Sequence, residues 1–144
     1  MRLALSLCLP LLAATPALSQ ALRELPETEP VPATISASIG ASLYPDENLE
    51  GIRRWEGNLV GDATPDLLVE AVLSPVGGNA VYARHWIFIG GPSGYGSYFP
   101  IELPGTLLTA GIDRNALVVT VPRLLPGEPR CCPTGVEAYR LPLN

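Results

Sequence analysis

Two short stretches contain the residues whose types and spacing could do chemistry. In the first, Asn58, Asp62 and Asp66 are spread over a loop of sequence G-N-L-V-G-D-A-T-P-D. Amide and carboxylate oxygens in such a loop can turn inward around a hard cation, and Ca²⁺ takes about 6 to 8 oxygen ligands. In the second, Cys131 and Cys132 are adjacent, and thiols can take part in redox or metal chemistry. We expect any chemistry to lie in these two stretches.

The loop matches the calcium pattern D-x-[DN]-x-[DN]-G only in part. Val60 stands where an oxygen ligand is expected, and Ala63 stands where Gly is needed for the sharp turn. The alternative is a polar turn that leads into a strand, in which Pro65 fixes φ and Asp66 opens a buried strand. Both interpretations fit the residues.

The stretch 57–69, G-N-L-V-G-D-A-T-P-D-L-L-V, resembles the G-D-L-N-G-D-G-x-P-D-L-V-V loop of FG-GAP/VCBS-type repeats. It is more similar still to small exported bacterial proteins that carry one such loop and a Cys-Cys-Pro near the C-terminus. Here the second motif is Cys131-Cys132-Pro133, and the resemblance covers Trp55 to Leu141. In the repeats the loop oxygens often hold Ca²⁺. The resemblance therefore implies calcium as a possible cofactor, held by Asn58, Asp62 and Asp66, and it implies no particular enzymatic activity.

The cysteine pair has several interpretations. Neighbouring Cα atoms lie about 3.8 Å apart, whereas disulfides prefer about 5.5 to 6 Å, so a bond between Cys131 and Cys132 would close a strained ring. Such a ring could stiffen the turn into the last strand, or serve as an easily reduced redox switch. Thiol-metal chemistry and intermolecular pairing are further alternatives. Two cysteines without a Cys-x-x-Cys spacing disfavour a zinc site.

The N-terminus has the layout of a secretory signal peptide. A charged start precedes an apolar core over 3–14 and a small-residue end at 17–19, which predicts cleavage after Ser19, with Ala21 as the alternative. Cys8 would leave with this peptide. The apolar core is shorter than the roughly 20 residues of a membrane-spanning helix and is broken by Pro10. We therefore expect an exported protein, periplasmic or secreted, without a membrane span.

The composition of the chain limits its class of partner and its domain organisation. The chain of 144 residues has 9 basic and 14 acidic side chains and a net charge of −5. Loss of Arg2 with the signal peptide leaves 8 basic side chains against 14 acidic ones, so the mature net charge becomes 8 − 14 = −6. An acidic chain with scattered Arg residues disfavours nucleic acid as a partner. We expect a Pro- and Glu-rich linker over 20–32, followed by a single domain over 33–144.

The first element of that domain, over 33–44, fits two templates. Ile35, Ile39 and Leu43 recur every four residues, which favours a short helix that ends before Pro45. The same stretch also alternates in a way that is typical of a strand. Its alanines and its few β-branched residues favour the helix, whereas Gly40 and the serines count against it.

The remaining elements are predicted to be strands without intervening helices. The run over 66–73 is almost continuously apolar and is interrupted only by Glu70, which is typical of a central strand that is covered on both faces. Together these patterns predict a mainly β fold, a small antiparallel sheet or sandwich-like domain with one short N-terminal helix. The predicted strands are 52–59, 66–73, 81–89, 98–103, 116–121 and 136–141.

Two further features could contribute to function. His85 is the sole histidine, and without a nucleophile beside it we interpret it as a partly buried strand residue. The glycine-rich segment 90–97 carries Tyr95, with Tyr98 just beyond, and is interpreted as a mobile connection or a protein-contact loop.

The function predicted from the sequence is an exported, non-enzymatic β-domain that binds an unidentified ligand or protein partner, or belongs to the cell envelope. A calcium-binding domain that uses the loop 58–66 is one alternative. A periplasmic thiol or disulfide protein that uses Cys131 and Cys132 is the other.

Overall fold

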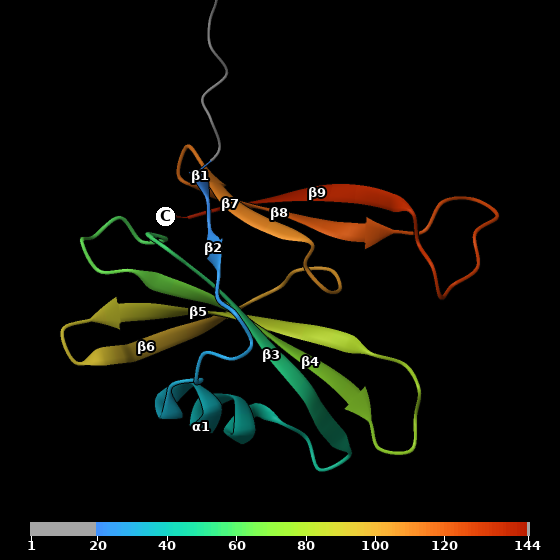
Figure 1. Cartoon of the computed structure of the whole chain (residues 1–144), viewed down its shortest axis with the longest axis horizontal. Helices are drawn as coiled ribbons and strands as arrows, with labels where there is room; N and C mark the ends of the chain where they lie inside the picture. Colours follow the sequence, from blue (N-terminus) through green and yellow to red (C-terminus); the bar gives the residue numbers. More distant parts are fainter. Residues whose placement is uncertain (1–19, 144) are drawn as a thin grey trace, which may run out of the picture.

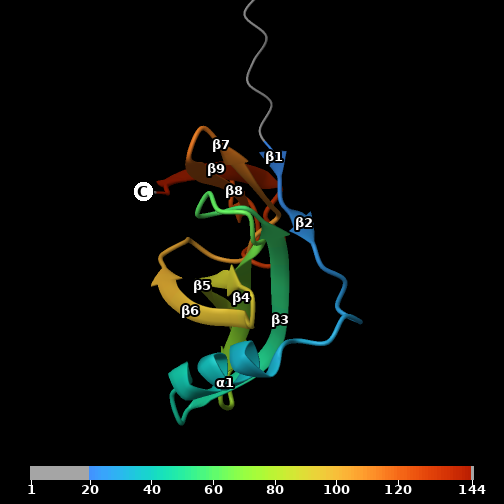
Figure 2. The same cartoon turned by 90° about the vertical axis from the view of Figure 1, so that its left-hand side faces the viewer.

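The structure is a computed structural model that describes residues 20–143. The predicted signal peptide 1–19 and Cys8 lie outside this range. Within it, the chain is mainly β, as predicted, with nine strands in two antiparallel sheets and one short helix. The small sheet packs over one face of the large sheet, and the helix lies on the other face (Figures 1 and 2).

The large sheet has the order β2-β3-β4-β5-β6, and the small sheet has the order β1-β7-β8-β9. The large sheet consists of β2 (Arg23–Glu24), β3 (Glu47–Gly57), β4 (Asp66–Pro75), β5 (Tyr82–Gly91) and β6 (Gly94–Ile101). The small sheet consists of β1 (Gln20–Ala21), β7 (Thr109–Asp113), β8 (Ala116–Arg123) and β9 (Gly135–Pro142). The helix α1 spans Ala33–Ser42.

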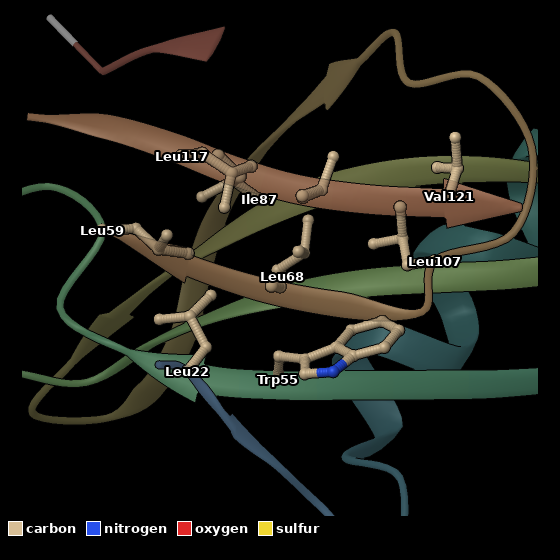
Figure 3. Packing of buried hydrophobic residues seen from close by; sticks show 10 residues of the cluster. Leu22, Trp55, Leu59, Leu68, Ile87, Leu107, Leu117 and Val121 are labelled. Atoms are coloured by element: carbon tan, nitrogen blue, oxygen red, sulfur yellow. The ribbon is translucent and has the colours of Figure 1, made fainter. Parts of the chain in front are cut away.

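Strand β4 is buried on both faces, as its apolar run predicts. Successive side chains of a strand point to opposite faces. Leu68 therefore packs between the sheets, where it joins Trp55, Ile87 and Leu117 (Figure 3). The residues that flank Leu68, Leu67 and Val69, pack toward α1 instead. Two cores, one on each side of β4, follow from this alternation.

The helical interpretation of the first element is confirmed by α1. Ile35 and Ile39 lie one turn apart and are fully buried against the large sheet. Burial of each such side chain stabilises the fold by roughly 1.5 to 3 kcal/mol. The helix ends at Ser42, and Leu43 is already extended, because Pro45 two residues later cannot continue the helix. The apolar period of four residues, and not the alternating pattern, therefore matches the structure of this segment.

Residues 20–32 differ from the predicted Pro- and Glu-rich linker. Its first residues form β1, which pairs with β7, and β2, which pairs with β3, so one short segment joins both sheets along one edge (Figure 1). Leu22 is buried between the sheets, and Leu25 is buried on the helix side of the large sheet. Two leucines among charged residues and prolines gave too weak a periodic signal for this role to be predicted.

The segment 90–97 also differs from the predicted loop. Strand β5 continues to Gly91, β6 begins at Gly94, and the two are joined by a tight turn. Gly94 has φ of 97°, a conformation that glycine adopts without strain. Tyr95 and Tyr98 therefore lie on an edge strand rather than on a loop.

Strand β7 was not predicted, since only five residues form it.

A buried charged cluster links the two sheets. Arg53, Glu70 and His85 are paired in register across β3, β4 and β5, so their side chains lie on the same face, toward the small sheet. Glu70 is fully buried. Its Oε1 accepts a hydrogen bond from Arg53 at 3.1 Å, and its Oε2 lies 3.1 Å from Nε2 of His85.

The same cluster anchors the crossover from β6 to β7. The backbone N–H of Leu107 donates to Oε2 of Glu70 at 2.6 Å, and Arg53 donates to the carbonyl of Leu107 at 2.7 Å. Both backbone groups of one buried crossover residue are thus satisfied by side chains of the large sheet. We call Arg53, Glu70, His85 and Leu107 the crossover clip.

Glu70→Ala is expected to lower the free energy of unfolding by about 3 to 5 kcal/mol, because it leaves Arg53 and the Leu107 N–H without their buried partner. Urea denaturation measures the loss. Glu56→Ala is the matched control on the same sheet, since its ion pair with Arg23 is partly exposed and should contribute no more than about 1 kcal/mol. Equal losses in the two variants would contradict a structural role for the clip.

Candidate functional site

The loop 58–65 is organised by Asp66, the first residue of β4. Its carboxylate is fully buried. Oδ2 accepts hydrogen bonds from the N–H groups of Leu59 at 2.9 Å and Val60 at 3.0 Å, and Oδ1 accepts one from Gly90 at 2.9 Å. Hydrogen bonds to a charged group are the strong ones in proteins. Asp66 therefore holds the loop to its own strand and to β5.

The other two predicted ligands also bond within the loop. Oδ1 of Asn58 accepts from the N–H of Gly61 at 2.6 Å, and its amide donates to the carbonyl of Asp62. Oδ1 of Asp62 accepts from the N–H of Thr64 at 2.8 Å. All three predicted ligands come together in one loop, but their oxygens face backbone N–H groups. Calcium would have to replace several of these bonds.

Gly90 lets the loop approach β5 closely. A Cβ atom at this position would lie 2.0 Å from the carbonyl oxygen of Pro65, closer than any side chain allows. At the same close approach, the N–H of Gly90 donates a hydrogen bond to the carboxylate of Asp66. Glycine is required at position 90 because a side chain would collide with the backbone of Pro65, and not because of an unusual φ angle.

The loop forms one wall of a pocket of about 460 Å³. Its lining residues come from this loop, from β6 of the large sheet and from β7, the turn after β7 and the end of β9 of the small sheet. In Figure 1 these segments meet at the end of the sandwich where the C-terminus lies. Seven of its ten lining residues are apolar, and the other three are two asparagines and a glycine. The lining residues are Asn58, Leu59, Val60, Gly61, Phe99, Ile112, Asn115, Leu141, Pro142 and Leu143.

The opposite wall is fixed by the turn between β7 and β8. Arg114 and Asn115 have φ of 45° and 60°, as in the two-residue turns that join strands with the native twist. Arg140 donates to the side chain of Asp113 at 2.5 Å and to its carbonyl at 2.7 Å, and the N–H of Leu143 donates to the carbonyl of Asn115 at 2.8 Å. These bonds hold the end of β9 beside the turn.

The cysteine pair lies at the opposite end of the small sheet, in the loop 124–134 between β8 and β9. Cys131 and Cys132 are exposed free thiols. The N–H of Cys132 donates to the carbonyl of Pro129 at 3.1 Å and closes a tight turn over 129–132. The neighbouring thiol of Cys131 raises the pKa of Cys132 above its usual value.

Glu128 holds the base of this loop together. The hydroxyl of Thr134 and the backbone N–H groups of Leu125 and Thr134 donate to its carboxylate. These hydrogen bonds lower the pKa of Glu128 below its usual value. Glu128 thereby links Leu125 near the start of the loop to Thr134 at its end.

The two tyrosines lie on the same side of the large sheet as Phe88, and they differ in burial. Tyr98 is exposed and stacks on Phe88 with ring centroids 4.9 Å apart. Tyr95 packs against the core on the helix side, and burial raises the pKa of its hydroxyl. Neither tyrosine lines the pocket between the sheets.

The buried pair of Glu70 and His85 was missed as a unit by sequence reasoning. Cross-strand register brings them together, and the only sequence signal was one acid inside an apolar run. Nδ1 of His85 is buried without a hydrogen-bond partner among the described residues. His85 is more deeply buried than predicted, with 2% of its surface exposed.

Comparisons of the chain with protein-family models, with curated proteins and with solved structures found no match. Between residues 20 and 143, no cluster of three or more His, Cys, Asp or Glu side chains is arranged to hold a metal ion. The only helix in that range, α1, is too short to cross a membrane.

Asp66→Ala is expected to destabilise the fold by about 3 kcal/mol or more, because each of three N–H groups that loses a buried acceptor costs about 1 to 3 kcal/mol. Chemical denaturation measures this loss. Asp62→Ala is the control, since its carboxylate is exposed and accepts one local bond, and it should cost about 1 kcal/mol at most.

The same denaturation experiment tests calcium. If hydrogen bonds alone organise the loop, excess Ca²⁺ and excess chelator should give the same unfolding midpoint for the wild-type chain. A midpoint that rises with Ca²⁺ and loses this response in Asp62→Ala would instead assign the loop to the ion.

Acid is expected to open the loop 124–134 locally. A carboxylate whose folded pKa is lowered stabilises the fold fully above its unfolded pKa, about 4.3 for Glu, and loses that effect as the pH falls through the folded pKa. The amide resonances of Leu125 and Thr134 should therefore shift with a midpoint below about 4.3. Glu128→Gln should abolish the transition. A midpoint at or above the ordinary value would contradict the hydrogen-bonded arrangement.

Proposed function

We propose that this chain is an exported binding domain that takes a small, largely apolar molecule into the pocket between its two sheets. The observation that carries the proposal is the pocket wall at 58–61, which Asp66 holds in place from beneath. Export is supported by the signal-peptide layout of 1–19.

The size and lining of the pocket support binding. Pockets for small molecules enclose about 300 to 1,000 Å³ and are lined mostly by apolar side chains with a few polar groups. A volume of about 460 Å³ with Asn58 and Asn115 on its wall fits this description. The apolar wall favours the apolar part of a ligand by burial, and the backbone and amide groups of the asparagines can orient it.

The chemistry of the lining supports binding rather than catalysis. None of the ten lining residues is an acid, a base, a serine or a cysteine. General acid-base and nucleophilic catalysis need such groups within hydrogen-bond reach of the substrate. We therefore propose a role in binding or in the cell envelope and not in turnover.

The pocket also gives the loop 57–66 a use that does not need a cation. Asp66 fixes the backbone, Leu59 is buried as an anchor, and Val60 remains 46% exposed on the wall. Calcium binding by Asn58, Asp62 and Asp66 is the alternative, and the chelator experiment above separates the two.

Nile red, a neutral dye that fluoresces in apolar sites, provides the first test. The wild-type chain should bind the dye saturably. Val60→Asp should raise the dissociation constant at least about tenfold, because dye binding would then desolvate a carboxylate on the pocket wall. An uncharged probe avoids simple repulsion by this acidic chain.

Val76→Asp is the matched control. Val76 is 61% exposed, lies just after β4 and does not line the pocket. It should leave dye affinity unchanged. Equal affinity of wild type and Val60→Asp would overturn the proposed site, and an equal loss in both variants would show that the dye reports general surface hydrophobicity.

A further inference from the structure

Strand β9 is the last strand of the small sheet, and its outer edge has no partner strand among residues 20–143. It pairs with β8 along its whole length without a bulge. No residue of β9 is buried, although the β8 residues that its inner face lies beside, Leu117, Val119 and Val121, are at most 3% exposed. The sandwich is therefore open along β9.

A proline shows which backbone groups of β9 point away from β8. Pro142 pairs with Ala116, and because proline has no N–H this pair cannot exchange hydrogen bonds. The bond from the Leu143 N–H to the Asn115 carbonyl, at 2.8 Å, lies directly beside the pair, as expected next to a pair of that kind. The backbone groups of Pro142 therefore face away from β8.

The outer edge of β9 consequently carries a regular row of unpaired backbone groups. Hydrogen-bonded and non-hydrogen-bonded pairs alternate along an antiparallel ladder. The N–H and carbonyl groups of Val136, Ala138 and Arg140 therefore point away from β8. The second proline of the ladder, Pro122 opposite Val136, also falls in a non-hydrogen-bonded pair. Among the described residues, no backbone group bonds to this row.

The last strand of the large sheet, β6, differs from β9 in this respect. It contains Pro100, and its ladder with β5 is irregular between Ile89 and Gly90. Proline and bulges are devices that keep edge strands from pairing with other chains. In β9 proline occurs only at the last residue. A free, regular edge of this kind is a template for a further strand.

We propose that β9 is a dimer interface, in which the β9 strands of two copies of this chain pair antiparallel about a two-fold axis at Ala138 and join the two small sheets into one. The row Val136, Ala138 and Arg140 does not line the pocket. The inference therefore does not rest on the proposed ligand.

Pairing about Ala138 satisfies the whole row. Ala138 of each copy donates to and accepts from its counterpart, and Val136 of one copy exchanges both bonds with Arg140 of the other. A two-fold interface brings the same patch of both copies together, and Ala138 is the smallest side chain of the row. An axis at Tyr139 would instead place Val136 opposite Pro142, which has no N–H to donate.

The charges of β9 also favour this register. With the axis at Ala138, Glu137 lies opposite Tyr139 of the other copy, and Arg140 lies opposite Val136. No like charges meet, and a tyrosine hydroxyl can donate to a carboxylate. An axis at Glu137 would bring two carboxylates directly opposite one another, which destabilises strand pairing. The sequence of β9 is thus complementary to itself in one register.

Sedimentation velocity of the purified chain provides the first test, with a reductant present so that the exposed thiols of Cys131 and Cys132 cannot link copies. The wild-type chain should form a dimer that dissociates on dilution. Ala138→Arg should raise the dissociation constant of the dimer at least about tenfold, because two guanidinium groups would meet at the axis. Ala80→Arg is the matched control, since Ala80 is equally exposed but lies in the loop after β4, and it should leave the dimer unchanged.

A charge exchange at position 138 tests the register itself. Ala138→Glu should weaken the dimer as Ala138→Arg does, whereas an equal mixture of the two variants should associate, because the axis places opposite charges side by side. Ala138 is exposed, and circular dichroism checks that both variants fold. A monomeric wild-type chain would refute the dimer. A dimer that Ala138→Arg leaves intact, or a mixture that associates no better than either variant alone, would exclude β9 as its interface.

Discussion

The structure depends on one buried carboxylate, Glu70, at the centre of the large sheet. It accepts hydrogen bonds from Arg53 and from the Leu107 N–H, and it lies within hydrogen-bond distance of His85. Burial of an ion costs several kcal/mol unless the ion is paired and its lone pairs are satisfied. The cost is offset here because the donors come from β3, from β5 and from the crossover to the small sheet. The charge thus serves to fix the position of one sheet over the other, which apolar packing alone does not specify.

Asp66 plays the same part for the loop at the start of β4. Its two oxygens accept hydrogen bonds from three backbone N–H groups, two of them in the loop and the third, that of Gly90, in β5. A loop of the calcium-binding type needs positive charge to balance its carboxylates, and in this structure N–H dipoles balance the charge of Asp66. With the backbone held in this way, Val60 and Ala63 at positions where calcium loops have an oxygen ligand and a glycine do not prevent a defined loop. The pocket wall is a consequence of this arrangement.

The sequence predicts the elements with strong periodic signals and misses those that depend on cross-strand register. The helix at 33–42 and the central strand at 66–73 followed from apolar periods of four residues and from a continuous apolar run. Strands β1, β2 and β7 are too short to show a period, and they form because a partner strand supplies their hydrogen bonds. For the same reason the neighbourhood of His85 could not be predicted. Glu70 lies fifteen residues away along the chain, and only pairing of β4 with β5 brings them together.

The two candidate sites lie at opposite ends of the small sheet, and its strands explain how each is positioned. At one end, the tight turn at Arg114 and Asn115 and the bonds of Arg140 to Asp113 place rigid backbone beside the loop 58–61. At the other end, β8 and β9 leave the sandwich together, and Glu128 closes the hairpin loop. Strand β8 is buried along its inner face by Leu117, Val119 and Val121, so it cannot shift by one residue without turning these side chains to solvent. Packing of β8 therefore fixes the register of the strands that lead to the turn at Arg114 and Asn115 at one end and to the loop 124–134 at the other.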